Sequence, residues 1–242
     1  MAAPTVLTPV GVASASASSI TPALPVVSFA DGDVIIGIGE SVADFPTAAS
    51  NGFAHIDSVS PVVQDTNTRL TVIWRRWTAG LTAHAWGDSG DHNLGAYIAI
   101  RGCKTTGNPW NVVGVAVDAT ADNSALWPGA TTTIADCLIL EIGGWSDDFA
   151  TGALTNGAYT SITERIDAVT ALGADGAIAL ISAIKASAGA TGQSTATLTG
   201  VAFKAMMTLA LEPAPPAAAG RPNQSRKYRV SSISPGGTSY GR

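Results

Sequence analysis

Two short stretches of this sequence combine residue types that can do chemistry. In the first, His84, Asp88, Asp91 and His92 lie within nine residues, and imidazole and carboxylate groups are ordinary metal ligands. Their spacing matches no metal-binding motif, however, and residues 87–93 are rich in turn formers. We therefore expect a solvated surface loop whose polar residues make turns, and no metal site.

The second stretch contains Asp147 and Asp148 between Trp145 and Phe149. Paired carboxylates beside an aromatic ring can bind calcium or a sugar, although a plain polar loop has the same composition. Trp127 falls in another predicted loop and can serve as a stacking platform. Trp127, Trp145, Asp147 and Asp148 are therefore candidate ligand-binding residues, and we expect no cofactor.

Nucleophile and nucleotide motifs are incomplete. Ser41 stands in Gly-Glu-Ser-Val-Ala, which lacks the second glycine of a G-x-S-x-G elbow. Residues 37–39 form only a fragment of a dinucleotide fingerprint, without a helical pattern after it. Many carboxylate pairs exist, and spacing selects none of them for glycoside hydrolysis. We expect a protein that is not an enzyme.

Composition favours a protein that packs against other proteins. Of 242 residues, 46% are apolar and 13% are charged, against the roughly 25% charged that soluble domains usually contain. Alanine, glycine, threonine and serine make up much of the balance. A surface built from such small and hydroxyl side chains suits a subunit of a larger assembly.

The charge is divided unevenly along the chain. The net charge is −5, but the residues after Glu212 contain five basic and no acidic side chains, so the remainder has 8 basic and 18 acidic residues, a net charge of −10. A basic tail on an acidic body is typical of an interaction arm. Five cations are few for nucleic acid, which the acidic body would repel, so we expect a protein partner. The expected contact residues are Arg221, Arg226, Lys227 and Arg229, which meet carboxylates, and Tyr228 and Ile233, which act as apolar anchors.

Alternating apolar side chains predict many short strands. The clearest runs are 34–38, 70–76, 96–101, 138–142 and 203–211. Residues 161–172 fit a helix or a strand, and we favour a strand; residues 177–185 are bounded by glycines at strand length. Residues 118–130 read as a long loop, and 143–148 as a break after the preceding strand. The predicted core residues are Trp74, Ile98, Ile100, Leu140, Leu209 and Leu211.

These patterns predict an all-β fold, an antiparallel jelly-roll-like β-sandwich with extended N- and C-terminal arms. Residues 1–25 are expected to be an extended arm, 26–213 the sandwich, and 214–242 a basic arm rich in Pro, Gly and Ser. Cys103 and Cys137 are expected to be buried or half-buried thiols, with their pairing left open. There is neither a signal-peptide pattern nor an apolar run long enough to insert into a membrane.

The order of several segments resembles a group of virion proteins. These segments are Gly32 to Ile36, Tyr97 to Gly102, Leu138 to Leu140, Thr163 to Asp167, Ala188 to Gly192 and Phe203 to Pro213. Their succession resembles tailed-bacteriophage virion proteins with a jelly-roll or lectin-like sandwich, over roughly residues 30–213.

The resemblance implies a structural component of a bacteriophage virion, either head decoration or a tail or neck accessory, assembled in the host cytoplasm and held in place by its arms. Its partners would be other virion proteins and copies of itself. The alternative is a carbohydrate-binding adhesion module of a tail or fibre that recognises a host surface glycan.

Overall fold

The computed structural model describes residues 1–42, 51–216 and 241, and this part of the chain is built from antiparallel β-sheets. A single 3-10 turn, Asp57–Val59, interrupts the strands there. Within the same residues, no helix is long and apolar enough to cross a membrane. The all-β expectation is therefore confirmed.

The first sheet has the strand order β1-β7-β3-β6-β4, with β2 added beside β7 and β5 beside β6. Its strands are β1 (Thr5–Val6), β2 (Ser14–Ser16), β3 (Val34–Ser41), β4 (Ala54–His55), β5 (Val62–Gln64), β6 (Thr68–Arg76) and β7 (Asn93–Arg101). The long central strands come from the runs in which side chains alternate most clearly.

The second sheet has the order β11-β12-β10-β14-β8. Its strands are β8 (Trp110–Trp127), β10 (Cys137–Trp145), β11 (Thr160–Thr170), β12 (Gly176–Lys185) and β14 (Ser194–Leu211). A small two-stranded sheet, β9 (Thr131–Thr132) with β13 (Gly189–Ala190), completes the fold.

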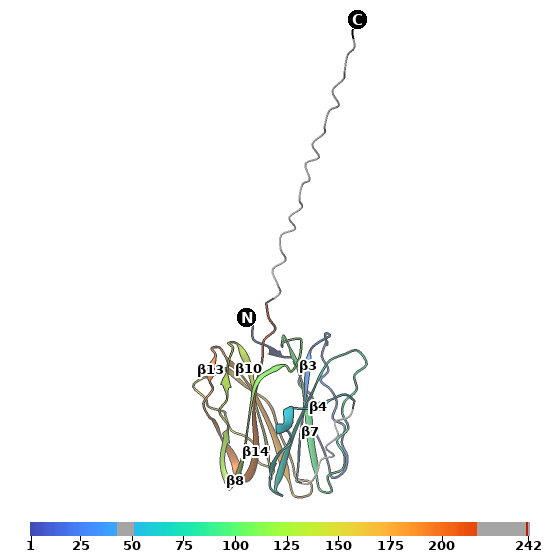
Figure 1. Ribbon diagram of the computed structural model, residues 1–242. Helices are drawn as coiled ribbons and strands as arrows, with labels where there is room; N and C mark the ends of the chain where they lie inside the picture. Colours follow the sequence, from blue (N-terminus) through green and yellow to red (C-terminus); the bar gives the residue numbers. More distant parts are fainter. Residues whose placement is uncertain (43–50, 217–240, 242) are drawn as a thin grey trace.

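The two large sheets face each other across one hydrophobic core (Figure 1). Ile36 and Ile98 contribute to it from the first sheet, and Leu140 and Leu209 from the second, all fully buried. Ile100 and Leu211 are buried there as predicted, while Trp74 is half-buried and packs against the core. Burial of this alternating face is what holds the sheets together.

Both sheets are also covered on their outer faces. On the second sheet, Trp127, Ile139, Trp145 and Met206 belong to a separate buried cluster. On the first, Ile35, Ile73, Trp86 and Tyr97 belong to another. The strands are consequently buried on both faces, which explains why β3, β10 and most of β12 read as nearly continuous apolar runs.

Two expected loops are strands. Residues 118–130, predicted to be a long loop, continue β8 to Trp127, because the first half of β14 supplies a ladder partner for them. The break expected at 143–148 begins only after Trp145, because Gly143 and Gly144 stay paired with both β12 and β14. By contrast, the strands predicted at 161–172 and 177–185 are confirmed as β11 and β12.

The start of the chain and the exit from β14 lie at the same end of the sheets (Figure 1). Thr5 pairs with Arg101, and Ala214 N–H donates to the carbonyl of Gly102 over 2.7 Å. Residues 1–25 were expected to be an arm outside the sandwich, but β1 and β2 within them pair with β7 as part of the first sheet. Most of the expected C-terminal arm lies outside the described residues.

Candidate functional site

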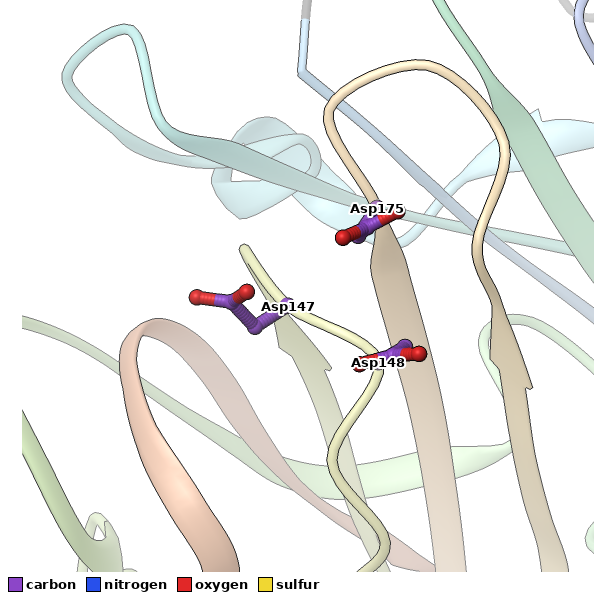
Figure 2. Close-up of side chains that lie close together, drawn as sticks. All are labelled: Asp147, Asp148 and Asp175. Carbon is purple, nitrogen blue, oxygen red and sulfur yellow. The ribbon is translucent and has the colours of Figure 1, made fainter.

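The end of the sheets opposite the termini carries three carboxylates close together. Asp147 and Asp148 follow β10, and Asp175 immediately precedes β12; their ligand oxygens all lie within 4.8 Å of one another (Figure 2). Burial raises the pKa of Asp147, and the charges of Asp175 and Asp148 raise it further. Such a group of like charges favours a cationic partner, either a metal ion or a lysine or arginine side chain.

A cleft of about 380 Å³ adjoins these carboxylates. It lies between the two sheets at the end that carries the three carboxylates. Its lining residues are Val42, Thr66, Asn67, Ser146, Asp147, Ala174 and Phe203. Apolar side chains therefore line the same hollow as one of the three carboxylates. A segment that carries both apolar and cationic side chains fits this chemistry.

Beneath this end, a series of hydrogen-bonded polar groups, fully buried at Glu40 and His92 and half-buried at Asp91, joins the two sheets. Oε2 of Glu40 lies 2.8 Å from Nε2 of His92, and Nδ1 of His92 lies 2.9 Å from Oδ1 of Asp91. Asp91 in turn accepts the backbone N–H of Ala174, in the turn between β11 and β12, over 2.7 Å. Thr68 Oγ1 donates to the other oxygen of Glu40 over 2.9 Å.

The pKa values in this chain of groups follow from burial and charge. Burial raises the pKa of Glu40 to about 7, although contacts with His92 oppose the shift. Burial disfavours the charged form of His92, but Glu40 and Asp91 outweigh it and raise the imidazole pKa. The N–H of Ala174 is the largest cause that lowers the pKa of Asp91. Glu40 and His92 therefore compete for a proton near neutral pH.

This arrangement is enclosed and holds part of the fold in place. Glu40 and His92 have no exposed side-chain surface, and the neighbouring hydroxyl residue, Ser41, is also buried. A Cβ atom at Gly176 would collide with both Glu40 and His92, so β12 approaches the pair closely enough to require glycine. Glu40, His92 and Asp91 together hold the turn before β12 against the first sheet. Asp175 belongs to this turn and is positioned with it.

A second buried carboxylate stands on the outer face of the second sheet. Tyr159 and Ser194 donate hydrogen bonds to Oε1 of Glu141 over 2.8 and 2.7 Å. The hydroxyl of Thr208 has one hydrogen, yet it contacts both Oε2 of Glu141 and the carbonyl of Pro128. A protonated Glu141 that donates to Thr208 satisfies both contacts, and burial raises its pKa accordingly. Glu141 is fully enclosed, so its role is internal.

A buried cation joins β14 to β8. Nζ of Lys204 lies 2.8 Å from Asp122, 3.1 Å from Asp118 and 3.3 Å from the carbonyl of Thr120, and its side chain is fully buried. The ladder between the strands is irregular at this point. The three oxygens replace the hydration that the ammonium group loses on burial.

The structure contradicts the predicted aromatic platform. Trp127 and Trp145 were expected in loops. Each is instead the last residue of a strand, β8 and β10 respectively, and both are fully buried. Their rings meet edge to face at 5.7 Å, and Nε1 of Trp127 donates to the carbonyl of Ile142 over 3.0 Å. Because large aromatic rings gain most from burial, they fill the outer cluster rather than the surface. A sugar cannot stack on either ring.

The expected solvated loop at 87–93 is only partly correct. Asp88 caps a turn by accepting the N–H of Gly90, as predicted, but His84 and His92 are buried. His92 is held inside by Glu40 and Asp91, and the four polar residues do not form a metal-ligand group among the described residues.

Sequence reasoning found Asp147 and Asp148 but missed Glu40 and Asp175. Glu40 had a usable signal, because it is an acidic residue directly after six uncharged, mostly apolar residues of the same strand. Asp175 had none, since an aspartate before a glycine reads as a turn. The predicted contact residues of the arm, Arg221, Arg226, Lys227, Tyr228, Arg229 and Ile233, lie outside the described residues.

Cys103 and Cys137 are both free and buried, as expected. Burial raises the pKa of Cys103 to about 12 and that of Cys137 to about 11. Both are therefore thiols rather than thiolates at neutral pH.

No protein-family model matches the chain, and comparisons with curated proteins and with solved structures find no significant match.

Proposed function

We propose that this protein is a non-enzymatic structural subunit of a bacteriophage virion, a jelly-roll-like sandwich held in its assembly by terminal arms. The observation that supports this most is the opposite placement of complementary charge. The chain leaves β14 toward its basic tail at one end of the sheets, while Asp147, Asp148 and Asp175 gather at the other end. This polarity suits copies that stack end to end.

In this proposal, the basic tail of one copy binds the acidic end of the next. The 26 residues from 217 to 242 can span on the order of 80 Å when extended. This exceeds the length of a strand such as β10, whose nine residues span about 30 Å, so the tail is long enough to reach along a neighbouring copy. Arg226, Lys227 and Arg229 would neutralise the carboxylates, and Tyr228 or Ile233 would enter the cleft beside Phe203. Ordering the tail costs roughly 1 to 2 kcal/mol per residue, so an extended contact is needed.

The buried polar groups favour a structural role over an enzymatic one. Glu40, Glu141 and Lys204 are each fully buried and engaged by neighbouring side chains. Their contacts join neighbouring strands of the same sheet: Glu40 binds β6 in the first sheet, while Glu141 and Lys204 join β14 to β10 and to β8 in the second. Virion placement itself rests on the order of segments that resembles phage virion proteins. The alternative of a host-glycan module has lost its two candidate stacking residues.

Sedimentation velocity of the purified chain at low and at high salt tests the proposed function. The full chain should form multimers at low salt that dissociate as salt rises, because exposed charge contacts are screened. A chain lacking 217–242 should stay folded, since its two-sheet core is intact, and should lose these multimers. Truncation after Pro216 keeps the hydrogen bond from Ala214 to Gly102.

Charge variants provide the matched controls. Changing Arg226, Lys227 and Arg229 to Gln, or Asp147, Asp148 and Asp175 to Asn, should each weaken assembly, and the combination should add little because both remove one interaction. Changing Asp31, an exposed carboxylate outside the acidic end, to Asn should have no effect. If the truncated chain assembles like the full chain, the tail has no assembly role and the proposal fails.

A further inference from the structure

Strand β8 has one open edge. It lies at the margin of the second sheet, and in the described part of the chain its ladder partner is β14 alone. From Val112 to Asp118 the ladder with β14 is regular, and residues 112–117 carry no charge. The backbone groups on the free side of this stretch are therefore presented as a straight, uncharged edge.

The hydrophobic core stays open along the same edge. Val113, Val115 and Val117 lie opposite Leu209, Met207 and Ala205 of β14, in the layer between the two sheets. These β14 residues are fully buried, whereas Val115 is 39% exposed and Val117 50% exposed. The outermost row of the core thus ends in solvent, which costs free energy that a further strand would recover.

The other sheet margins differ from β8. In the first sheet the edge strands β1, β2, β4 and β5 are two or three residues long. At the other margin of the second sheet, β11 carries Glu164, Arg165 and Asp167 and has two breaks in register. Short strands, charges and bulges are the usual features that prevent edge pairing. The stretch 112–117 has none of them.

We propose that β8 pairs with β8 of a second copy of this chain, antiparallel and about a two-fold axis that passes through Val115. Val115 then faces its own counterpart, and Val113 faces Val117 of the other copy. The two second sheets become one continuous ten-stranded sheet, and the open valine row is closed on both sides.

The edge is complementary to itself. In this register no charged side chain stands opposite another, because Asp118 faces Val112 and is already bound by Lys204. Opposite residues on an antiparallel pair point to the same face, so the odd-numbered valines of both copies meet in the core layer. A two-fold contact of this kind closes as a dimer and leaves the ends of the sheets free.

The inference goes beyond the tail contact proposed above and does not depend on it. Backbone pairing and valine packing are little affected by salt, whereas the tail contact is screened. Sedimentation velocity of the full chain at high salt should therefore still show a dimer. Neutralising the tail cations should abolish the larger multimers and leave this dimer, so the two proposals can fail separately.

Substitutions at the two margins of the second sheet locate the contact. Val115→Lys should raise the dimer dissociation constant roughly tenfold or more, because it places two ammonium groups against each other. Val169→Lys, at a valine of β11 that is 46% exposed, should leave the constant unchanged. A dimer weakened by Val169→Lys and not by Val115→Lys would place the contact at β11 and overturn the proposal, as would a wild-type chain that is monomeric at high salt.

Cross-linking tests the register without a charged substitution. In the proposed pair the two copies of residue 115 have Cα atoms about 4.5 to 5.5 Å apart, within disulfide range. Val115→Cys should therefore yield a covalent dimer on mild oxidation, while Cys103 and Cys137 stay buried. Ala119→Cys, exposed on the same strand, should not, because its two copies lie roughly 26 Å apart. Equal cross-linking at both positions, or cross-linking at 119 alone, would overturn the register.

Discussion

Nε2 of His92 lies 2.8 Å from Oε2 of Glu40, and neither side chain is exposed to solvent. The pair connects the end of β3 to the residue before β7, and through Asp91 it reaches the turn before β12. A proton is shared inside the protein at the end where the three surface carboxylates gather. Stability should therefore depend on pH in a defined direction.

We expect the free energy of unfolding to fall as pH rises from about 5 to 8. The pKa of Glu40 rises from 4.5 to about 7 on folding, so the folded state binds the proton more tightly and loses that advantage as pH rises through this window. The raised pKa of His92 acts in the same direction. Denaturant unfolding at several pH values measures the decline, which should be on the order of 2 to 3 kcal/mol.

Two variants assign this pH dependence. Glu40→Gln should flatten much of the decline, since an amide does not titrate. Thr68→Val removes a hydrogen bond to Glu40 but leaves both titrating groups, so it should lower stability and keep the decline. If the free energy of unfolding of the wild-type protein is constant or rises over this pH range, folding does not raise the pKa values of Glu40 and His92.

Leu209→Ala should destabilise the protein by roughly 2 to 5 kcal/mol, because it opens a cavity between the two sheets. Leu209 is fully buried and lies between Leu140 and Val113 in the ladder. Val201→Ala, on a side chain that is 57% exposed, serves as the control and should change stability by less than about 0.5 kcal/mol. Chemical denaturation measures both, and equal losses would contradict the assigned core.

Trp127→Phe should cost roughly 1 to 3 kcal/mol, since it removes the hydrogen bond from Nε1 to the carbonyl of Ile142 and replaces a fully buried indole by a smaller ring. The smaller ring also leaves a cavity in the outer cluster, so the loss combines the hydrogen bond with the lost packing. Thermal or chemical unfolding measures it. Added monosaccharides should leave the fluorescence of the wild-type protein unchanged at this residue, and a saturable change that is lost in Trp127→Phe would show that the buried position is wrong.

Thermal unfolding should give the same melting temperature with and without a chelator. The core is apolar, and the buried charges are bound by other side chains, so folding requires no ion. Asp175→Asn should raise the melting temperature slightly above pH 6, because it relieves repulsion at Asp147. A fall of many degrees on chelation, abolished in Asp175→Asn, would instead identify an ion that the carboxylates hold.

Both cysteines should resist alkylation at pH 8 in the native protein and react fully after unfolding. Burial excludes the reagent, and the pKa values of about 12 and about 11 keep the thiols protonated. Thiol titration by mass spectrometry with and without denaturant counts the reactive groups. Rapid native labelling of Cys103 or Cys137 would contradict their burial.

Local alternation was enough to predict most strands. In Leu138 to Ile142 and in Lys204 to Leu211, every second side chain is apolar, and those side chains fill the core between the sheets. The all-β class and the burial of Leu140 and Leu209 followed from this period alone. Period two reports which residues share a face, and it needs no knowledge of the partner strand.

Strand ends depended on distant residues. Residues 118–125 are small or polar, which predicts a loop, yet they form a strand because β14 pairs with them and Lys204 binds Asp118 and Asp122. Gly143 resembles a break, but the ring of Trp145 occupies the space that a side chain there would need. Local composition contains neither fact.

The sequence by itself determined most of the strands, the alternating core and the uneven charge between body and tail, because each depends on neighbours along the chain. Only the tertiary structure decided which polar groups meet. Glu40 reaches His92 across 52 residues, and Asp175 joins Asp147 across the intervening strand β11. These contacts depend on the order and register of the strands. Local periodicity does not fix that order or register, because sequences with the same periodicity can pair their strands differently.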